Sequence, residues 1–139
     1  MFHPVLSTLN HQQNMEYFGY RKLATYVKAR ELVRVVYALL KTFPREEMFA
    51  LCSQIRRAAV SITSNIAEGM TRYSNKEKVH FLEMSYGSLM ELMSQFEVAL
   101  DQGYISDGDF EYIETFVADV ARLLSGLQRS FMENNNNKV

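Results

Sequence analysis

The chain has 139 residues, which suits one domain, and 47% of them are hydrophobic, which is enough to build a sizeable core. No apolar run approaches the ~18 residues that cross a bilayer, and the opening MFHPVLSTL lacks the cationic start of a signal peptide. Cys52 is the one cysteine, so no internal disulfide can form and a cytoplasmic location is expected.

The first predicted helix runs from about Tyr20 to Thr42. Its apolar residues recur at steps of three or four, the spacing of one helix face. Phe43-Pro44 ends it, because a proline disfavours helix in the residue before it. The stripe consists of Ala29, Leu32, Val33, Val36 and Leu40.

The second predicted helix begins at Pro44, a residue that suits the first helical position, and ends at Gly69, a plausible left-handed terminator. It carries more apolar surface than one stripe requires. One row is Leu51, Ile55, Ala58 and Ile62, and a second is Cys52, Ala59 and Ile66. Helix one adds Val35 and Leu39 beyond its stripe. Because soluble monomers avoid large apolar patches, we expect this surplus to pack between subunits.

Polar residues form a ladder beside the seam of the second helix, where short Ser and Asn side chains tend to be kept for hydrogen bonds. In an antiparallel pair joined near residues 71–73, positions whose numbers sum to about 145 lie side by side. Arg57 therefore approaches Ser88 and Glu91. Either Arg56 or Arg57 is expected to bond Glu91, in a polar layer that fixes the register of the two helices. The alternative is that Arg56 and Arg57 bind phosphate. The expected polar layer comprises Arg56, Arg57, Ser61, Asn65, Glu68, Ser88 and Glu91.

The third predicted helix opens with a capping box, Ser74 to Glu77, and ends near Gly103. Its seam alternates steps of three and four: Val79, Leu82, Tyr86, Leu89, Met93, Phe96 and Leu100. The fourth begins at Ser106-Asp107 and repeats that alternation in Phe110, Ile113, Val117, Val120, Leu124, Leu127 and Phe131.

These elements predict an all-α fold, an antiparallel up-down four-helix bundle over residues 19–132. The connections are only a few residues long, so neighbouring helices must run in opposite directions. Residues 1–18 are expected to form a mobile N-terminal tail and residues 133–139 a disordered C-terminal tail, because both have too little apolar surface to offset ordering entropy.

The sequence contains no complete catalytic motif, and no enzyme activity, cofactor or small-molecule substrate is expected. Glu77 and His80 have the Glu-x-x-His spacing of dinuclear carboxylate bundles, but that site needs a second such pair. The histidines of the chain are His3, His11 and His80, and they cannot supply a second pair within one subunit. No metal is therefore expected. Cys52 lies on an apolar stripe and is expected to be a buried, inert thiol.

Charge divides the chain into two halves despite a net charge of −1. Residues 21–78 hold 12 Lys or Arg against 5 Asp or Glu, and residues 79–133 hold 2 against 10. A basic face of helices one and two favours RNA or a ribonucleoprotein partner. Its candidate residues are Arg21, Lys22, Lys28, Arg30, Arg34, Lys41 and Arg45, with Tyr20, Tyr26 and Tyr73 available for stacking. The alternative is a protein-protein interaction scaffold without nucleic-acid binding.

Three segments together resemble a known family: KLATYVKARELVRVVYALLKTFPREE, LCSQIRRAAVSITSNIAEGMTR and FLEMSYGSLMELMSQFEVA. The chain is similar to the bacterial four-helix-bundle proteins encoded in intervening sequences of large-subunit ribosomal RNA genes. The similarity covers about Tyr20 to Phe131, with no tryptophan near Tyr26 where the family often has one. It implies a helical bundle that assembles into a ring, a homopentamer. The chain more distantly resembles the accessory variability proteins of diversity-generating retroelements, which partner a reverse transcriptase and its RNA.

Overall fold

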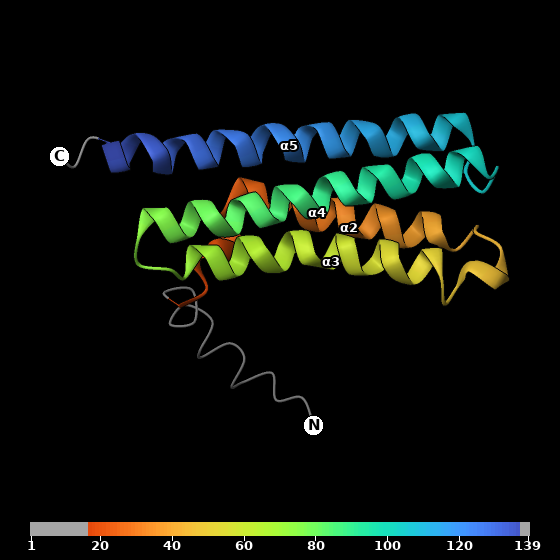
Figure 1. Cartoon of the computed structure of the whole chain (residues 1–139), viewed down its shortest axis with the longest axis horizontal. Helices are drawn as coiled ribbons and strands as arrows, with labels where there is room; N and C mark the ends of the chain where they lie inside the picture. The colour runs from red at the N-terminus through yellow and green to blue at the C-terminus, as the bar shows by residue number, and fades with distance from the viewer. Residues whose placement is uncertain (1–16, 137–139) are drawn as a thin grey trace, which may run out of the picture.

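Four long helices lie side by side in the computed structural model, which describes the backbone of residues 17–136 and the side chains of residues 17–133 (Figure 1). Within this range no residue is in a strand, which confirms the all-helical prediction. The elements are η1 (Gly19–Lys22), α2 (Ala24–Leu40), η2 (Arg45–Glu47), α3 (Leu51–Met70), α4 (Asn75–Asp101) and α5 (Asp107–Asn136). Most of the two expected tails lies outside the described residues, and α5 continues past position 133 to Asn136.

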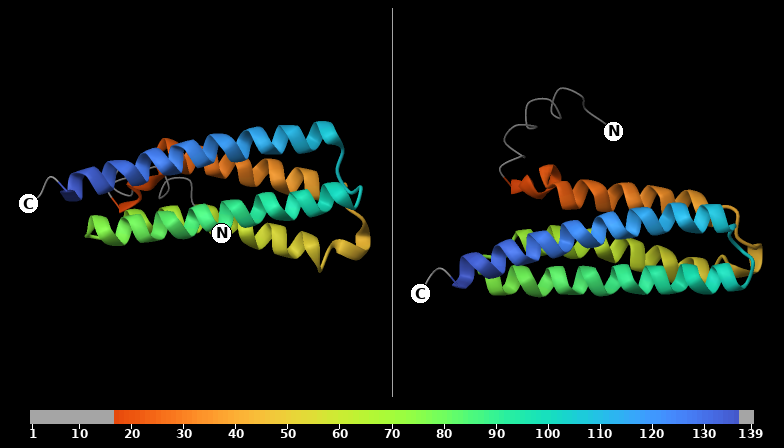
Figure 2. Two further views of the ribbon diagram at one scale, coloured as in Figure 1. Left: turned by 45° about the horizontal axis from the view of Figure 1, so that its top comes forward. Right: turned by 90° about the horizontal axis from the view of Figure 1, so that it is seen from above.

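The helices pack in a closed order, α2 on α3, α3 on α4, α4 on α5 and α5 on α2. Figure 2 shows the four helices from two further directions. Every helix therefore has two neighbours, and its buried face is broader than a single seam. The largest fully buried side chains come from all four helices and include Leu32, Ile62, Phe96 and Leu124.

Both early helices begin later than predicted. Leu23 has extended backbone and separates η1 from α2. Pro44 also has extended backbone, so it precedes the short η2 turn instead of opening α3, which begins at Leu51. The Glu47 carboxylate accepts a hydrogen bond from the Leu51 N–H at 3.2 Å. An acidic group at this end of a helix satisfies an unpaired donor and suits the helix dipole.

Gly69 does not terminate α3 in a left-handed conformation, because the only positive-φ glycine in the described backbone is Gly103, at +76°. Gly69 lies one residue before the end of α3 and faces α4. A Cβ at this position would stand 2.7 Å from the Cβ of Phe81. The glycine is thus required by the close approach of two helices.

The seam of α4 differs from the predicted one. Tyr86 is 36% exposed, whereas Ser85 is fully buried and its Oγ donates to the Ile62 carbonyl at 2.9 Å. Since α4 contacts both α3 and α5, its buried face combines two stripes: Leu82, Ser85, Leu89, Leu92, Gln95, Phe96 and Ala99. The predicted seam of α5 is buried at Ile113, Val117, Val120 and Leu124.

The surplus apolar surface expected on α3 is covered within one chain. The prediction that this surface needs a second subunit to cover it is therefore wrong. Both rows are buried between α2 and α4, at Cys52, Ile55, Ala58, Ala59, Ile62 and Ile66. Val35 and Leu39 pack against the same core. Other apolar side chains remain exposed. Phe49, just before α3, is 90% exposed, more than any other phenylalanine among the described residues.

Candidate nucleic-acid interface

Three adjoining hollows follow one side of α2, and we call them together the α2–α3 groove. The first has a volume of about 260 Å³ and is lined by Tyr26, Arg30, Val33, Arg34 and Thr63. The second, of about 380 Å³, is lined by Val33, Arg34, Tyr37, Ala38 and Lys41. The third, of about 220 Å³, is lined by Tyr37, Leu40, Lys41, Phe43, Pro44, Met48, Cys52 and Arg56. Each hollow shares two residues with the next, so the groove is continuous.

The charged residues that line the α2–α3 groove are all positive. Its four cations are Arg30, Arg34, Lys41 and Arg56, and no carboxylate is among its lining residues. Among the described side chains none of the four forms an ion pair. The Arg56 Nη1 donates to the Met48 carbonyl at 3.4 Å, and the Arg30 guanidinium lies 6.0 Å from the Tyr26 ring centroid. Uncompensated cations along a groove raise the local concentration of anions.

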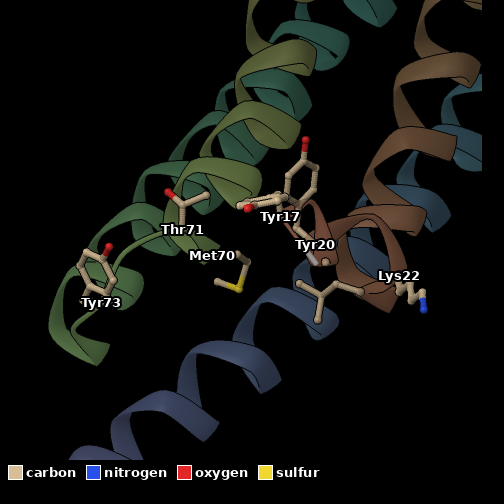
Figure 3. A pocket seen from close by; sticks show the side chains of 8 residues that line it. Tyr17, Tyr20, Lys22, Met70, Thr71 and Tyr73 are labelled. Carbon is tan, nitrogen blue, oxygen red and sulfur yellow. The ribbon is translucent and has the colours of Figure 1, made fainter. Parts of the chain in front are cut away.

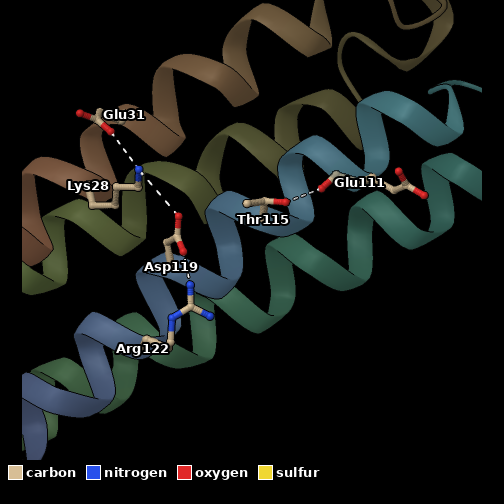
Figure 4. A network of polar contacts seen from close by, with 6 residues as sticks. All are labelled: Lys28, Glu31, Glu111, Thr115, Asp119 and Arg122. Carbon is tan, nitrogen blue, oxygen red and sulfur yellow. Dashed lines mark hydrogen bonds and ion pairs between the residues drawn. The ribbon is translucent and has the colours of Figure 1, made fainter.

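Lys28, predicted to belong to the same basic face, is instead neutralised on the α5 side of the bundle. Its Nζ lies 3.4 Å from a Glu31 oxygen and 3.8 Å from an Asp119 oxygen. Figure 4 shows this network, in which Asp119 also pairs with Arg122. The ammonium additionally lies 4.6 Å from the Phe116 ring centroid. Lys28 therefore links α2 to α5.

The remaining predicted cations lie at the two ends of α2. Arg21 stacks over the Phe18 ring at 4.5 Å, and Arg45 is exposed in η2. Lys22 lines a separate open pocket of about 790 Å³, where η1 meets the end of α3 (Figure 3). The structure thus brings together Arg30, Arg34 and Lys41 from the predicted set and separates the other four.

The expected polar layer forms between α3 and α4 only around its serines. The Ser61 and Ser88 hydroxyls are 2.8 Å apart, and the Asn65 amide donates to the Ser61 carbonyl at 2.9 Å and to its Oγ at 3.1 Å. The predicted bond from Arg56 or Arg57 to Glu91 does not occur among the described residues.

Solvent explains this difference. Arg57 and Glu91 are both exposed, so water solvates each charge and little is gained by pairing them. Glu91 accepts instead from the Gln95 amide at 3.2 Å, and Glu68 pairs with Arg72 at 2.8 Å.

Tyr37 is the groove residue that the sequence analysis does not indicate as a binding candidate. It follows Arg34 by three residues and precedes Lys41 by four, which places all three on one helix face. Arg56 is predicted in the polar layer, with phosphate binding as the alternative, and it lines the groove. The tyrosines that were considered lie elsewhere or are covered. Tyr20 packs edge-on against Tyr26, with ring centroids 4.9 Å apart, and Tyr73 is fully exposed beyond α3.

Reactive groups are few in the described part of the chain. Cys52 is buried, and burial raises the pKa of its thiol, against a smaller lowering by the charge of Arg56 and with a still smaller rise from Glu47. A raised pKa disfavours the nucleophilic thiolate. No group of three or more metal-ligating side chains occurs among the described residues. No helix in the same range is both long and apolar enough to span a membrane.

Comparisons with known proteins agree with the bundle. Residues 21–126 match the family described as 23S rRNA-intervening sequence protein. The fold is similar to the crystal structure of a protein of unknown function from the S23 ribosomal protein family of Bacteroides thetaiotaomicron, with a TM-score of 0.68 and 23% identity. That similarity covers 76% of this chain and 98% of the other. No curated protein matches the chain.

Proposed function

This chain belongs to the 23S rRNA-intervening sequence protein family, and we propose that it is a non-enzymatic, oligomeric helical scaffold of the cytoplasm that binds RNA through the α2–α3 groove. The observation that carries this proposal is the row of four cations without an ion pair or a lining carboxylate. From Arg30 to Lys41 the row extends about 16 Å along α2, which is enough for several phosphates.

The proposal includes an antiparallel up-down order of helices and a ring of five copies, the assembly that the family resemblance implies. The helix order is supported by two contacts between α3 and α4, Ser61 with Ser88 and Ile62 with Ser85. From the first contact to the second, the residue number rises along α3 and falls along α4, as it does between helices of opposite direction. RNA binding through the α2–α3 groove requires that this ring leave the groove open to solvent.

RNA binding is tested by titrating a structured RNA at several salt concentrations in a filter-binding assay. The groove variant carries Arg30→Gln and Arg34→Gln, and the matched control carries Lys76→Gln and Arg129→Gln, two exposed cations outside the groove. We expect affinity to fall with salt, and the groove variant to reduce the steepness of that fall by about 0.7 to 1 for each phosphate that is no longer bound. Equal reductions in both double variants would contradict the assignment to the groove.

A second candidate function is a protein-protein scaffold in which the groove is covered by a neighbouring copy. It is favoured by the acidic outer sides of α4 and α5, where many exposed carboxylates face solvent: Glu83, Glu91, Glu97, Asp101, Asp107, Asp109, Glu111 and Glu114. Complementary faces of one chain can meet head to tail and close a ring. This candidate requires that the assembled protein show no salt-dependent RNA binding.

A further inference from the structure

One tyrosine of the α2–α3 groove has a partly exposed ring without an aromatic or cationic partner among the described side chains. Tyr37 is 41% exposed, and within residues 17–136 it forms no aromatic pair and no cation contact. Tyr26, at the other end of the groove, is already covered by Tyr20 and Arg30. Tyr37 is therefore the groove aromatic that is free to receive a ligand.

Tyr37 separates two hollows. Its side chain lines both the hollow of about 380 Å³ and the hollow of about 220 Å³. Arg34 lines the first, Arg56 lines the second, and Lys41 lines both. Tyr37 thus borders two hollows, and each hollow has a cation among its lining residues.

We propose that the α2–α3 groove takes an unpaired RNA segment, with a base stacked on Tyr37 and the neighbouring phosphates held by Arg34 and Lys41. This inference rests on the proposed function and adds the class of RNA. Alternating cations and aromatic rings are the arrangement that binds single strands, because every base has a face to stack and every linkage has a charge. In an RNA duplex the bases are paired and stacked, and the deep, narrow major groove keeps side chains from them.

The test compares a short labelled oligouridine with the same strand paired to oligoadenine, by fluorescence anisotropy. The wild-type chain is expected to bind the unpaired strand more tightly. Tyr37→Ala is expected to weaken binding of the unpaired strand by about 5- to 150-fold, the loss of one stacked base, whereas Tyr37→Phe keeps the ring and the affinity. Tyr112→Ala is the matched control, since Tyr112 is a 53% exposed tyrosine on α5. Its affinity is expected to equal that of the wild type.

Two results overturn this inference without overturning the proposed function. One is a Tyr37→Ala variant that is folded by circular dichroism and binds the unpaired strand as tightly as the wild type. The other is equal affinity of the wild type for paired and unpaired strands. In both cases a loss of RNA binding in the Arg30 and Arg34 double variant still supports the proposed function. A wild-type chain that binds neither RNA overturns both proposals together.

Discussion

At the scale of single residues, Gly69 is the described glycine at which α3 and α4 leave no room for a side chain. Its hydrogen occupies a position where any larger group meets the Cβ of Phe81, a backbone-anchored atom that has no freedom to turn away. Gly87, in the interior of α4, is the opposite case. It is exposed, and a Cβ built there has no neighbour within 4 Å.

Gly69→Ala is expected to destabilise the fold by about 1–3 kcal/mol, because α3 and α4 must separate to admit the methyl group. The matched control, Gly87→Ala, is expected to stabilise it by about 0.5–1 kcal/mol, since alanine favours helix over glycine where there is space. Urea denaturation followed by circular dichroism measures both free energies of unfolding. A Gly69→Ala protein as stable as the wild type would show that the two helices are not held at this distance.

At the scale of helices, serine side chains fix where α4 and α5 begin. Ser74 Oγ accepts from the Glu77 N–H at 3.1 Å, and Ser106 Oγ accepts from the Asp109 N–H at 3.1 Å. Both bonds satisfy donors that the helix itself leaves unpaired. These starts could be read from the sequence because the capping bond is local and spans only three residues.

Ser74→Ala is expected to lower the free energy of unfolding by about 1 kcal/mol, through loss of the cap. Ser94→Ala provides the control, because Ser94 is an exposed residue inside α4. There alanine is expected to be neutral or to add a few tenths of a kcal/mol from its higher helix propensity. Chemical denaturation of the two variants side by side measures the difference, and equal stabilities would argue against a capping role.

At the scale of the whole molecule, one chain covers its own core. The rows of α3 that indicated an apolar surplus are both buried between α2 and α4. The ring that we propose therefore has to use surface that remains exposed, which includes the positive α2–α3 groove and the carboxylates on the outer sides of α4 and α5.

Light scattering is expected to return a mass close to five subunits at low salt. If oppositely charged faces meet between copies, the mass falls as salt is raised, because exposed charges are screened. If the groove stays open, the mass is unchanged by salt while RNA binding weakens. A monomer at both low and high salt would contradict the ring.

By itself the sequence determined the class of fold and its main elements. Helical periodicity, serine caps and the apolar seam of α5 are local patterns, and each depends on residues within a few turns of one another. They located four helices and the connections near residues 71–74 and 102–106. They also indicated Arg30, Arg34 and Lys41 as one basic face.

Only the tertiary structure decided which surface is buried, paired or free. Lys28 and Arg34 look equivalent along α2, but Asp119 of α5 neutralises the first and no acidic side chain in the described chain pairs with the second. The sequence predicts Gly69 as a helix terminator, whereas in the structure it allows the close approach of Phe81. In each case the deciding partner is on another helix, and a helical period carries no information about the distance to a neighbouring helix.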